Sequence, residues 1–289
     1  MLRQRIITAI VLLAILLPAL FYPTPLPLMC VVLALVAAGA WEWGRLNGLG
    51  PAAALAWGAV CLLLCALTWW LGWVEQPLRA LWLLAGLAWV LGGAWLLRAG
   101  VAGWPHIPRA LRLLGGLLAL WLAWLALAQA RRMGVNFLLS VLVLVWVADI
   151  FAYFCGRAFG LRWTHNKLAP TISPGKTWEG VWGGLIGVQL LAFGWAAADA
   201  HWQVQPPSFY GMVAAPGGWR WGLLAVVALF LGAMSVVGDL VESLVKRSAG
   251  VKDSSGLLPG HGGVLDRVDA LLPTLPLAMM LARWLQGAP

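Results

Sequence analysis

The sequence predicts an all-α, polytopic integral membrane protein with about nine transmembrane helices. Two observations carry this prediction. Of the 289 residues, 62% are hydrophobic and only 10% are charged, whereas a soluble domain has roughly 25% charged residues. The apolar residues also gather in runs of the roughly 20 residues that a helix needs to cross a bilayer. Lipid, rather than water, is therefore expected to cover most of the chain.

Nine apolar runs give the approximate spans. The first run follows two arginines, as in a signal peptide, but no small-residue cleavage site precedes Pro23 and further spans follow, so we expect a retained helix. Cys61 and Cys65 lie one turn apart in the third run and are interpreted as packing residues. The expected spans are 6–22, 26–43, 52–73, 77–98, 110–130, 135–156, 178–198, 219–241 and 265–286.

Polarity divides the chain into two regions. Residues 1–130 contain five expected helices with few polar groups, and we expect them to form a transmembrane scaffold. Residues 131–289 contain the other four helices and eight of the ten acidic residues, all but Asp199 near helix ends on one side. Acids placed for solubility would not segregate in this way, so we expect this second region to be catalytic.

Basic residues predict the orientation. In a soluble protein a net charge of +9 would suggest nucleic acid, but beside apolar helices Lys and Arg mark the cytoplasmic side, and we expect no nucleic-acid partner. With a cytoplasmic N-terminus, 14 of the 19 basic residues fall on or near that side and five fall outside. The Arg131–Arg132 pair opposes this locally. The polar loops after the sixth and eighth spans then both face the cytoplasm.

The eighth span ends in five polar residues at helical spacing, which would share one face: Ser235, Asp239, Glu242, Ser243 and Lys246. Facing lipid, a central Asp or Lys costs about 2.5–3.5 kcal/mol. We therefore expect this stripe to line the bundle interior or a wet cavity. The alternative is a packing face held by a Glu242–Lys246 ion pair.

The stretch GHGGVLDRVD, residues 260–269, opens the ninth span. Asp266 and Asp269 are three residues apart in the expected first turn, where the helix dipole favours acids. His261 precedes Gly262 and Gly263, which allow a backbone to approach a ligand closely. Acids that bind divalent cations next to bases that bind phosphate predict a metal–phosphate site. The loop before this stretch supplies further charges: Lys246, Arg247, Lys252 and Asp253.

Polar residues also end the sixth span, where three share a face by their spacing: Asp149, Tyr153 and Arg157. The segment GKT that follows suggests a phosphate-binding P-loop, but Pro170 stands where that motif needs glycine and no strand is expected before it. Ser173 or Thr177 could instead cap the seventh helix. Lys167 and Lys176 are candidate phosphate contacts.

The segment SLVKRSAGVKDSSGLLPGHGGVLDRVD, residues 243–269, resembles the signature of the phosphatidate cytidylyltransferase family, also called CDP-diacylglycerol synthases. Every signature position matches: the serine, Lys-Arg, Lys-Asp, Pro or Gly, His-Gly-Gly and Asp-Arg-x-Asp. DIFAYFCGRAFG and KLAPTISPGKTWEG are similar to upstream segments of the family, so the resemblance covers roughly 145–270. Ser255 and Ala270 depart where glycine and serine are common, which concerns only loop detail.

The resemblance implies that CTP and phosphatidate react to give CDP-diacylglycerol and diphosphate. The lipid phosphate would attack the α-phosphorus of CTP in line, with Mg²⁺ as cofactor and a second cation left open. The expected catalytic residues are Lys246, Lys252, His261 and Arg267. The expected substrate contacts are Ser173, Lys176, Ser243, Arg247, Gly262 and Gly263. The expected metal ligands are Asp239 and Asp266, with Asp253 and Asp269 as weaker candidates.

The resemblance also implies an enzyme of the bacterial inner membrane with its site facing the cytoplasm, in contact with membrane lipids; a homodimer stays open. One alternative is a CDP-alcohol phosphotransferase, but that family needs Asp-Gly and Ala-Arg within a spaced aspartate motif, which residues 266–269 lack. A second alternative is an ion or lipid transporter, since intramembrane acids would suit one. Turnover that depends strictly on CTP in detergent distinguishes the enzyme from the transporter.

Overall fold

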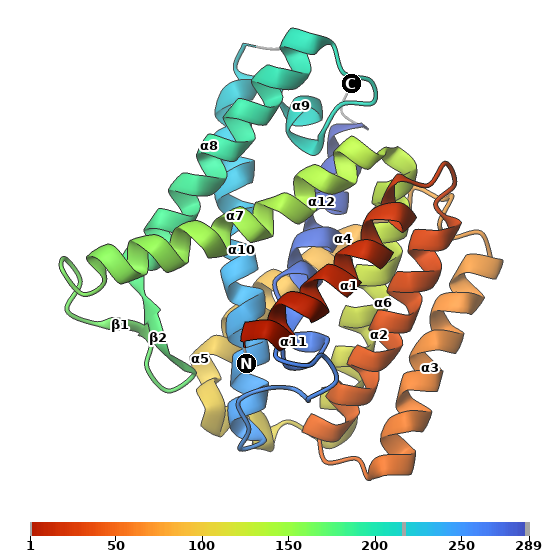
Figure 1. Cartoon of the computed structure of the whole chain (residues 1–289), viewed down its shortest axis with the longest axis vertical. Helices are drawn as coiled ribbons and strands as arrows, with labels where there is room; N and C mark the ends of the chain where they lie inside the picture. Colours follow the sequence, from red (N-terminus) through yellow and green to blue (C-terminus); the bar gives the residue numbers. More distant parts are fainter. Residues whose placement is uncertain (1, 216–217, 287–289) are drawn as a thin grey trace.

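A computed structural model describes residues 2–215 and 218–286, and within them the chain is a bundle of α-helices (Figure 1). In this described part, nine helical stretches are long and apolar enough to cross a membrane, which confirms the predicted fold class. Seven of them are single helices: α1 (Leu2–Phe21), α2 (Leu26–Leu46), α3 (Pro51–Trp70), α6 (Arg109–Met133), α7 (Val135–Phe159), α8 (Trp178–Trp202) and α10 (Arg220–Ser248).

Two spans are interrupted. The fourth consists of α4 (Arg79–Leu87), a π-helical turn η1 (Ala88–Gly92), α5 (Gly93–Gly103) and a 3₁₀ turn η2 (Trp104–His106). The ninth begins with α11 (Leu265–Val268) and continues, after a break at residues 269–270, as α12 (Leu271–Leu285). The start at Leu265 was predicted. The break was not, because nothing in a hydropathy pattern marks it.

Helix boundaries follow local chemistry. Thr177, one of the two predicted candidates, caps α8, because its Oγ1 accepts a hydrogen bond of 3.2 Å from the backbone nitrogen of Gly180. Proline opens α3 at its first position, where the missing N–H costs nothing. Gly134, with a φ of +141°, makes the one-residue turn between α6 and α7.

Two short elements were not predicted. The segment after α7 was expected as a loop but contains an antiparallel hairpin of β1 (Lys167–Ala169) and β2 (Ser173–Thr177). The segment after α8, which was expected to be external, contains a helix of six residues, α9 (Phe209–Ala214), capped by Ser208. Both are too short, and too rich in Pro, Gly and polar residues nearby, to give a clear periodic pattern.

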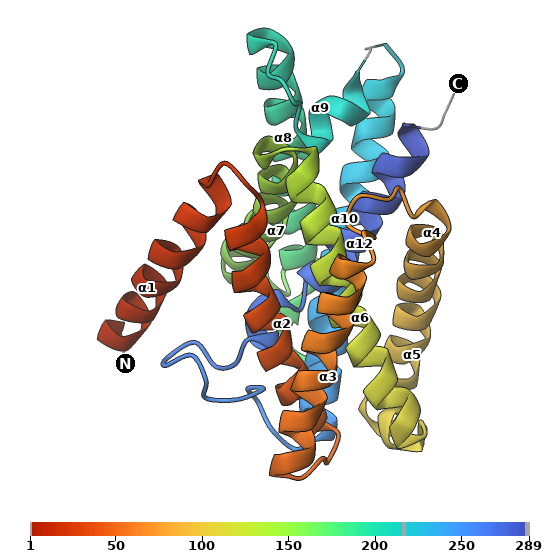
Figure 2. The ribbon, with the colours of Figure 1, turned by 90° about the vertical axis from the view of Figure 1, so that its right-hand side faces the viewer.

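The arrangement gathers the polar loops at one end. Helices α7 and α8 make the most extensive contact of any pair; a Cβ on Gly184 would lie only 2.8 Å from the carbonyl oxygen of Ala148, so glycine allows this approach. The hairpin extends from their lower end, on the same side of the bundle as the loop after α10, whereas α9 lies at the opposite end (Figure 1). Helix α12 packs between α6, α4 and α10, and α1 leans away from the body (Figure 2).

Candidate active site

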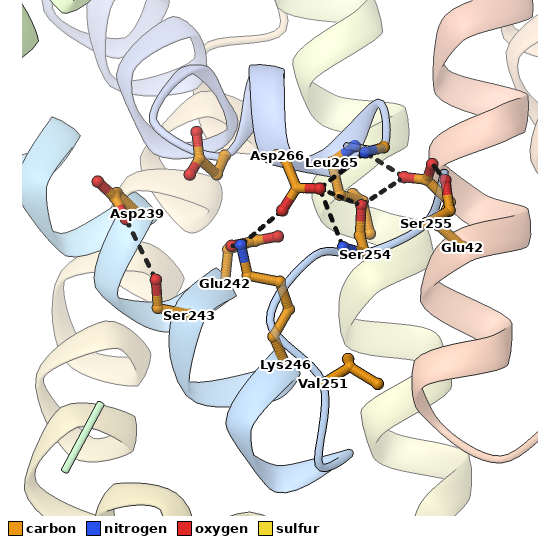
Figure 3. Close-up of polar contacts among 12 residues, drawn as sticks. Glu42, Asp239, Glu242, Ser243, Lys246, Val251, Ser254, Ser255, Leu265 and Asp266 are labelled. Atoms are coloured by element: carbon orange, nitrogen blue, oxygen red, sulfur yellow. Dashed lines mark hydrogen bonds and ion pairs between the residues drawn. The ribbon is translucent and has the colours of Figure 1, made fainter. Parts of the chain in front are cut away.

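Four elements bring the predicted site residues together: the hairpin, the end of α10, the loop of residues 249–264 and α11 (Figures 1 and 3). Strand β2 approaches α10 directly, since the side chain of Lys176 forms an ion pair with Asp239. Arg247, at the end of α10, also lies 3.4 Å from the carbonyl oxygen of Ile172 before β2. The two polar segments that the sequence placed on one side of the membrane are therefore in contact.

A chain of ion pairs and hydrogen bonds crosses the centre of this region (Figure 3). Lys246 lies 2.6 Å from Glu242 on the same helix and 2.5 Å from Asp266 on α11. The other carboxylate oxygen of Asp266 accepts from the backbone nitrogens of Gly263, at 2.7 Å, and Ser254, at 2.9 Å. The Ser254 hydroxyl adds a contact of 3.0 Å. Asp266 thus ties the loop to α10.

The polar stripe predicted on α10 lies in two different environments, one buried and one partly exposed. Glu242 and Lys246 form the i, i+4 ion pair of the alternative interpretation, and both are largely buried, so this part of the stripe is a packing face. Asp239 is about a quarter exposed, beside Lys176, and accepts a hydrogen bond of 3.3 Å from the Ser243 hydroxyl. Ser235 is buried and donates to its own helix at Gly232, so it takes no part in the site. The stripe faces protein, as its cost in lipid required.

Three aspartates from different elements lie close enough to interact electrostatically: Asp149 on α7, Asp239 on α10 and Asp269 at the α11–α12 break. The cationic groups of Lys176 and Arg267 act on the same cluster. Asp269 accepts a hydrogen bond from the Ala270 nitrogen at 2.8 Å. The predicted pair of neighbours in the first turn is therefore divided, with Asp266 turned to Lys246 and Asp269 turned to the aspartate cluster.

Among the described residues, the aspartate cluster has the chemistry of a divalent-cation site but not its completed geometry. Its carboxylates bring the oxygen ligands that Mg²⁺ prefers, and the ammonium group of Lys176 already places a positive charge beside Asp239. Within residues 2–215 and 218–286, no three acidic, His or Cys side chains already surround one point, so phosphate oxygens and water would have to complete the shell, as is usual for Mg²⁺. Donors occupy both oxygens of Asp239 as well, but they are two side chains, whereas backbone N–H groups of Ser254 and Gly263 also hold Asp266, so Asp266 fits less well. The ligand assignment stays a prediction.

A cavity of about 460 Å³ opens beside this cluster, between α7, α8 and α10. Its lining includes the three residues predicted to share a face at the end of the sixth span, and Tyr153 and Arg157 contact each other at 3.2 Å. Lys176 and Thr177 of the hairpin line it too. Glycines and alanines form much of the remaining wall. The cavity therefore combines an apolar wall with an aspartate, an arginine and a lysine.

The remaining predicted residues lie around these contacts. Gly262 has a φ of +81°, and a Cβ there would lie 2.5 Å from Asp266, so only glycine suits this turn. The backbone of Gly263 donates to Asp266, which gives both glycines a structural reason besides any contact with nucleotide. His261 donates its backbone N–H to Leu258 at 2.8 Å. The predicted bases Lys252 and Arg267 and the acid Asp253 are exposed, and Ser173 is half-buried in β2.

Sequence reasoning missed two acids that organise the loops. Glu179 accepts from the backbone nitrogens of Trp163, at 3.1 Å, and Thr164, at 2.7 Å, and so holds the chain before the hairpin. Glu42, on α2, binds the loop before α11 through four hydrogen bonds. The signal for Glu42 was present: an acid within an apolar span is costly and needs partners.

Helix α1 also contacts the loop. The Nε of Arg5 donates to the Gly260 carbonyl at 3.0 Å, and the Thr8 hydroxyl donates to the Pro259 carbonyl at 2.8 Å. The signature loop is therefore fixed at its tip by α1 and near its end by α2. Both helices belong to the region expected to be a scaffold.

This geometry gathers acidic and basic side chains beside a cavity at one end of a bundle of helices that are long and apolar enough to cross a membrane. Comparison with known proteins identifies the family. The model of the cytidylyltransferase family matches residues 3–285. The phosphatidate cytidylyltransferase of Pseudomonas aeruginosa is 41% identical over the full length of both chains. Its namesake from Haemophilus influenzae is 37% identical over 96% of each chain, and that from Brucella abortus is 42% identical over 66% of this chain and 60% of its own.

The chain belongs to the cytidylyltransferase family and is a nucleotidyltransferase of the membrane. The resemblance found in the signature is confirmed, and it extends through the N-terminal helices as well. The enzyme hypothesis is thereby favoured over the transporter.

Proposed function

We propose that the protein is a phosphatidate cytidylyltransferase, which converts CTP and phosphatidate to CDP-diacylglycerol and diphosphate. One observation carries this proposal: Lys176 forms an ion pair with Asp239 of the aspartate cluster, beside a partly apolar cavity among helices long enough to span a membrane. A lipid with a phosphate headgroup and a soluble nucleotide can meet only where such polar groups lie at the edge of the bilayer. The names of the relatives support the same substrates.

The reaction needs no side-chain nucleophile. An oxygen of the phosphatidate phosphate forms a bond to the α-phosphorus of CTP while the bond from that phosphorus to the bridging oxygen of the β-phosphate breaks, and diphosphate leaves. Bound Mg²⁺ would neutralise charge that develops on the phosphates. The chain's own basic residues bring two anions together and orient them, and positioning with electrostatic stabilisation supplies most of the rate.

The residues divide by location. Lys176 and Arg157 line the cavity and are placed to hold phosphate there. Arg267 acts on the aspartate cluster from the start of the ninth span. Lys252, exposed in the loop, is placed to meet the triphosphate of an incoming nucleotide. The excess of basic residues at this end supports a site that faces the cytoplasm of the bacterial inner membrane, where CTP and Mg²⁺ are present.

One assay tests the proposal. Protein purified in detergent is incubated with CTP labelled at the α-phosphate, phosphatidate and Mg²⁺, and the lipid product is analysed. We expect labelled CDP-diacylglycerol that requires phosphatidate and disappears with EDTA, and we expect turnover to return when Mg²⁺ is added in excess. A lipid product without label, or turnover unaffected by chelation, contradicts the substrate assignment or the metal assignment respectively.

A further inference from the structure

Glu42 is a fully buried carboxylate on the second transmembrane helix (0% exposed). Burying a charge without compensation is costly, so its partners show what it is for. Four donors surround it, and all come from residues 254–265 (Figure 3). The backbone nitrogens of Val264 and Leu265 donate at 2.9 and 2.8 Å, and the hydroxyls of Ser254 and Ser255 lie at 3.1 and 2.5 Å.

These contacts place the negative charge at the start of α11. A carboxylate that accepts from the first N–H groups of a helix satisfies donors that the helix cannot satisfy itself. In the part of the chain that the structure describes, no Lys or Arg comes within ion-pair distance of Glu42. Its charge is therefore balanced by the loop and by the first residue of α11, and not by a cation on another helix.

The loop is shaped to fit this carboxylate. A Cβ added to Gly263 would lie 2.3 Å from the Oε1 of Glu42 and 2.1 Å from the Oγ of Ser254, so a side chain at this position would displace both. The second glycine of His-Gly-Gly thus has a steric reason. Glu42 and Gly263 are 221 residues apart in sequence, yet the carboxylate of Glu42 packs directly against the backbone of Gly263.

Glu42 is connected to the charged centre through one hydroxyl. The Oγ of Ser254 lies 3.1 Å from Glu42 and 3.0 Å from Asp266, so its single proton is shared between the two carboxylates. Asp266 in turn lies 2.5 Å from Lys246. Displacement of Ser254 would therefore disturb Asp266 and, through it, Lys246, which is three contacts away from Glu42.

We propose that Glu42 is a positioning residue for cytidylyl transfer: it anchors residues 254–265 on α2, so that Asp266 and Lys246 are held in the arrangement that the reaction needs. This inference rests on the proposed function. It gives the N-terminal helices a part in the chemistry of the C-terminal signature. A purely structural Glu42 would affect how much protein folds, but not the turnover of the protein that has folded.

The test compares Glu42→Gln with Glu75→Gln, the same chemical change at a half-exposed acid whose partner is Arg132. Turnover is measured against CTP and phosphatidate, and hydrogen exchange is followed in peptides that contain Val264 and Leu265. We expect Glu42→Gln to lower kcat about thirtyfold, with less than a threefold change in KM for CTP, and to speed exchange of the two amides at least tenfold. Glu42→Asp should recover part of kcat because it keeps the charge. Glu75→Gln should match wild type.

Wild-type kcat in Glu42→Gln, or wild-type exchange at residues 264 and 265, would overturn the positioning role. Should Glu42→Gln not fold, Ser254→Ala tests the same connection, since it leaves Glu42 and three of its donors in place; we expect at least a fivefold fall in kcat, and an unchanged kcat overturns the proposal. Wild-type turnover separates the two claims. An inactive wild type contradicts the proposed function, whereas an active wild type with an equally active Glu42→Gln contradicts only the positioning role.

Discussion

Replacement of Asp266 by Asn distinguishes two roles for this residue. The sequence suggested a metal ligand. In the structure, one carboxylate oxygen of Asp266 accepts a hydrogen bond from the Lys246 ammonium group, and the other accepts from two backbone N–H groups. Asparagine has one oxygen. If that oxygen keeps the backbone N–H groups of Ser254 and Gly263, its NH₂ group must face the ammonium group of Lys246. The contact with Lys246 is then lost.

The size of the loss follows from these contacts. A hydrogen bond to a charged group contributes about 1.5–3 kcal/mol, and Lys246 keeps Glu242 at 2.6 Å as a partner. We therefore expect Asp266→Asn to cost about 2–3 kcal/mol of stability, well above the roughly 0.3–1 kcal/mol of a helix-dipole interaction alone. If the same contact positions Lys246 in the transition state, kcat falls by about a hundredfold, since each 1.36 kcal/mol is tenfold in rate.

Unfolding by SDS in mixed micelles measures the stability, and Mg²⁺ titrations of turnover measure the metal requirement. The control is Asp253→Asn, in the same loop but exposed, which should leave the unfolding midpoint unchanged. For a loop-organising Asp266 we expect a lower unfolding midpoint and a half-saturating Mg²⁺ concentration within about twofold of wild type. An unchanged midpoint with a strongly raised Mg²⁺ requirement would refute this reasoning and restore Asp266 as a metal ligand.

Three further substitutions test other parts of the site and the fold. Lys176→Gln removes the cation that pairs with Asp239 beside the cavity; we expect the KM for CTP to rise about tenfold, and a CTP titration with unchanged KM would contradict a phosphate contact. Thr177→Ala removes the cap of α8 and should cost about 1 kcal/mol in SDS unfolding, with Thr177→Ser as the matched control. Cys61→Ala combined with Cys65→Ala should keep nearly full turnover, because both side chains are buried among apolar residues; loss of turnover in folded protein would reveal a site there.

Much of the fold could be predicted because a bilayer leaves few solutions. Every spanning segment must satisfy its own backbone, so apolar runs of sufficient length are helices. Polar spacing also predicted which residues of α10 would share a protected face, and the ion pair between Glu242 and Lys246 that was considered as the alternative interpretation is present. The break near Asp269 and the hairpin after α7 were missed, because both depend on tertiary contacts that leave no periodic pattern in the sequence.

In the candidate site, too, features with a local sequence pattern could be predicted, and those that depend on tertiary contacts could not. Residues of the signature lie within 27 positions of one another, so their proximity could be predicted from the chain alone. Asp149 could be placed on the correct helix face by spacing, but only the packing of α7 beside α10 brings it near Asp239.

Glu42 shows more clearly what residue spacing cannot predict. Residue spacing cannot predict a contact across more than 200 residues. The free-energy cost of a carboxylate in an apolar span does predict that the carboxylate has hydrogen-bond donors around it. The loop before α11 has such donors in Ser254 and two backbone N–H groups. The sequence also offered Arg45, three residues further along the same helix, as a partner for Glu42, and only the structure shows that Arg45 lies over Trp41 while residues 254–265 bind the carboxylate.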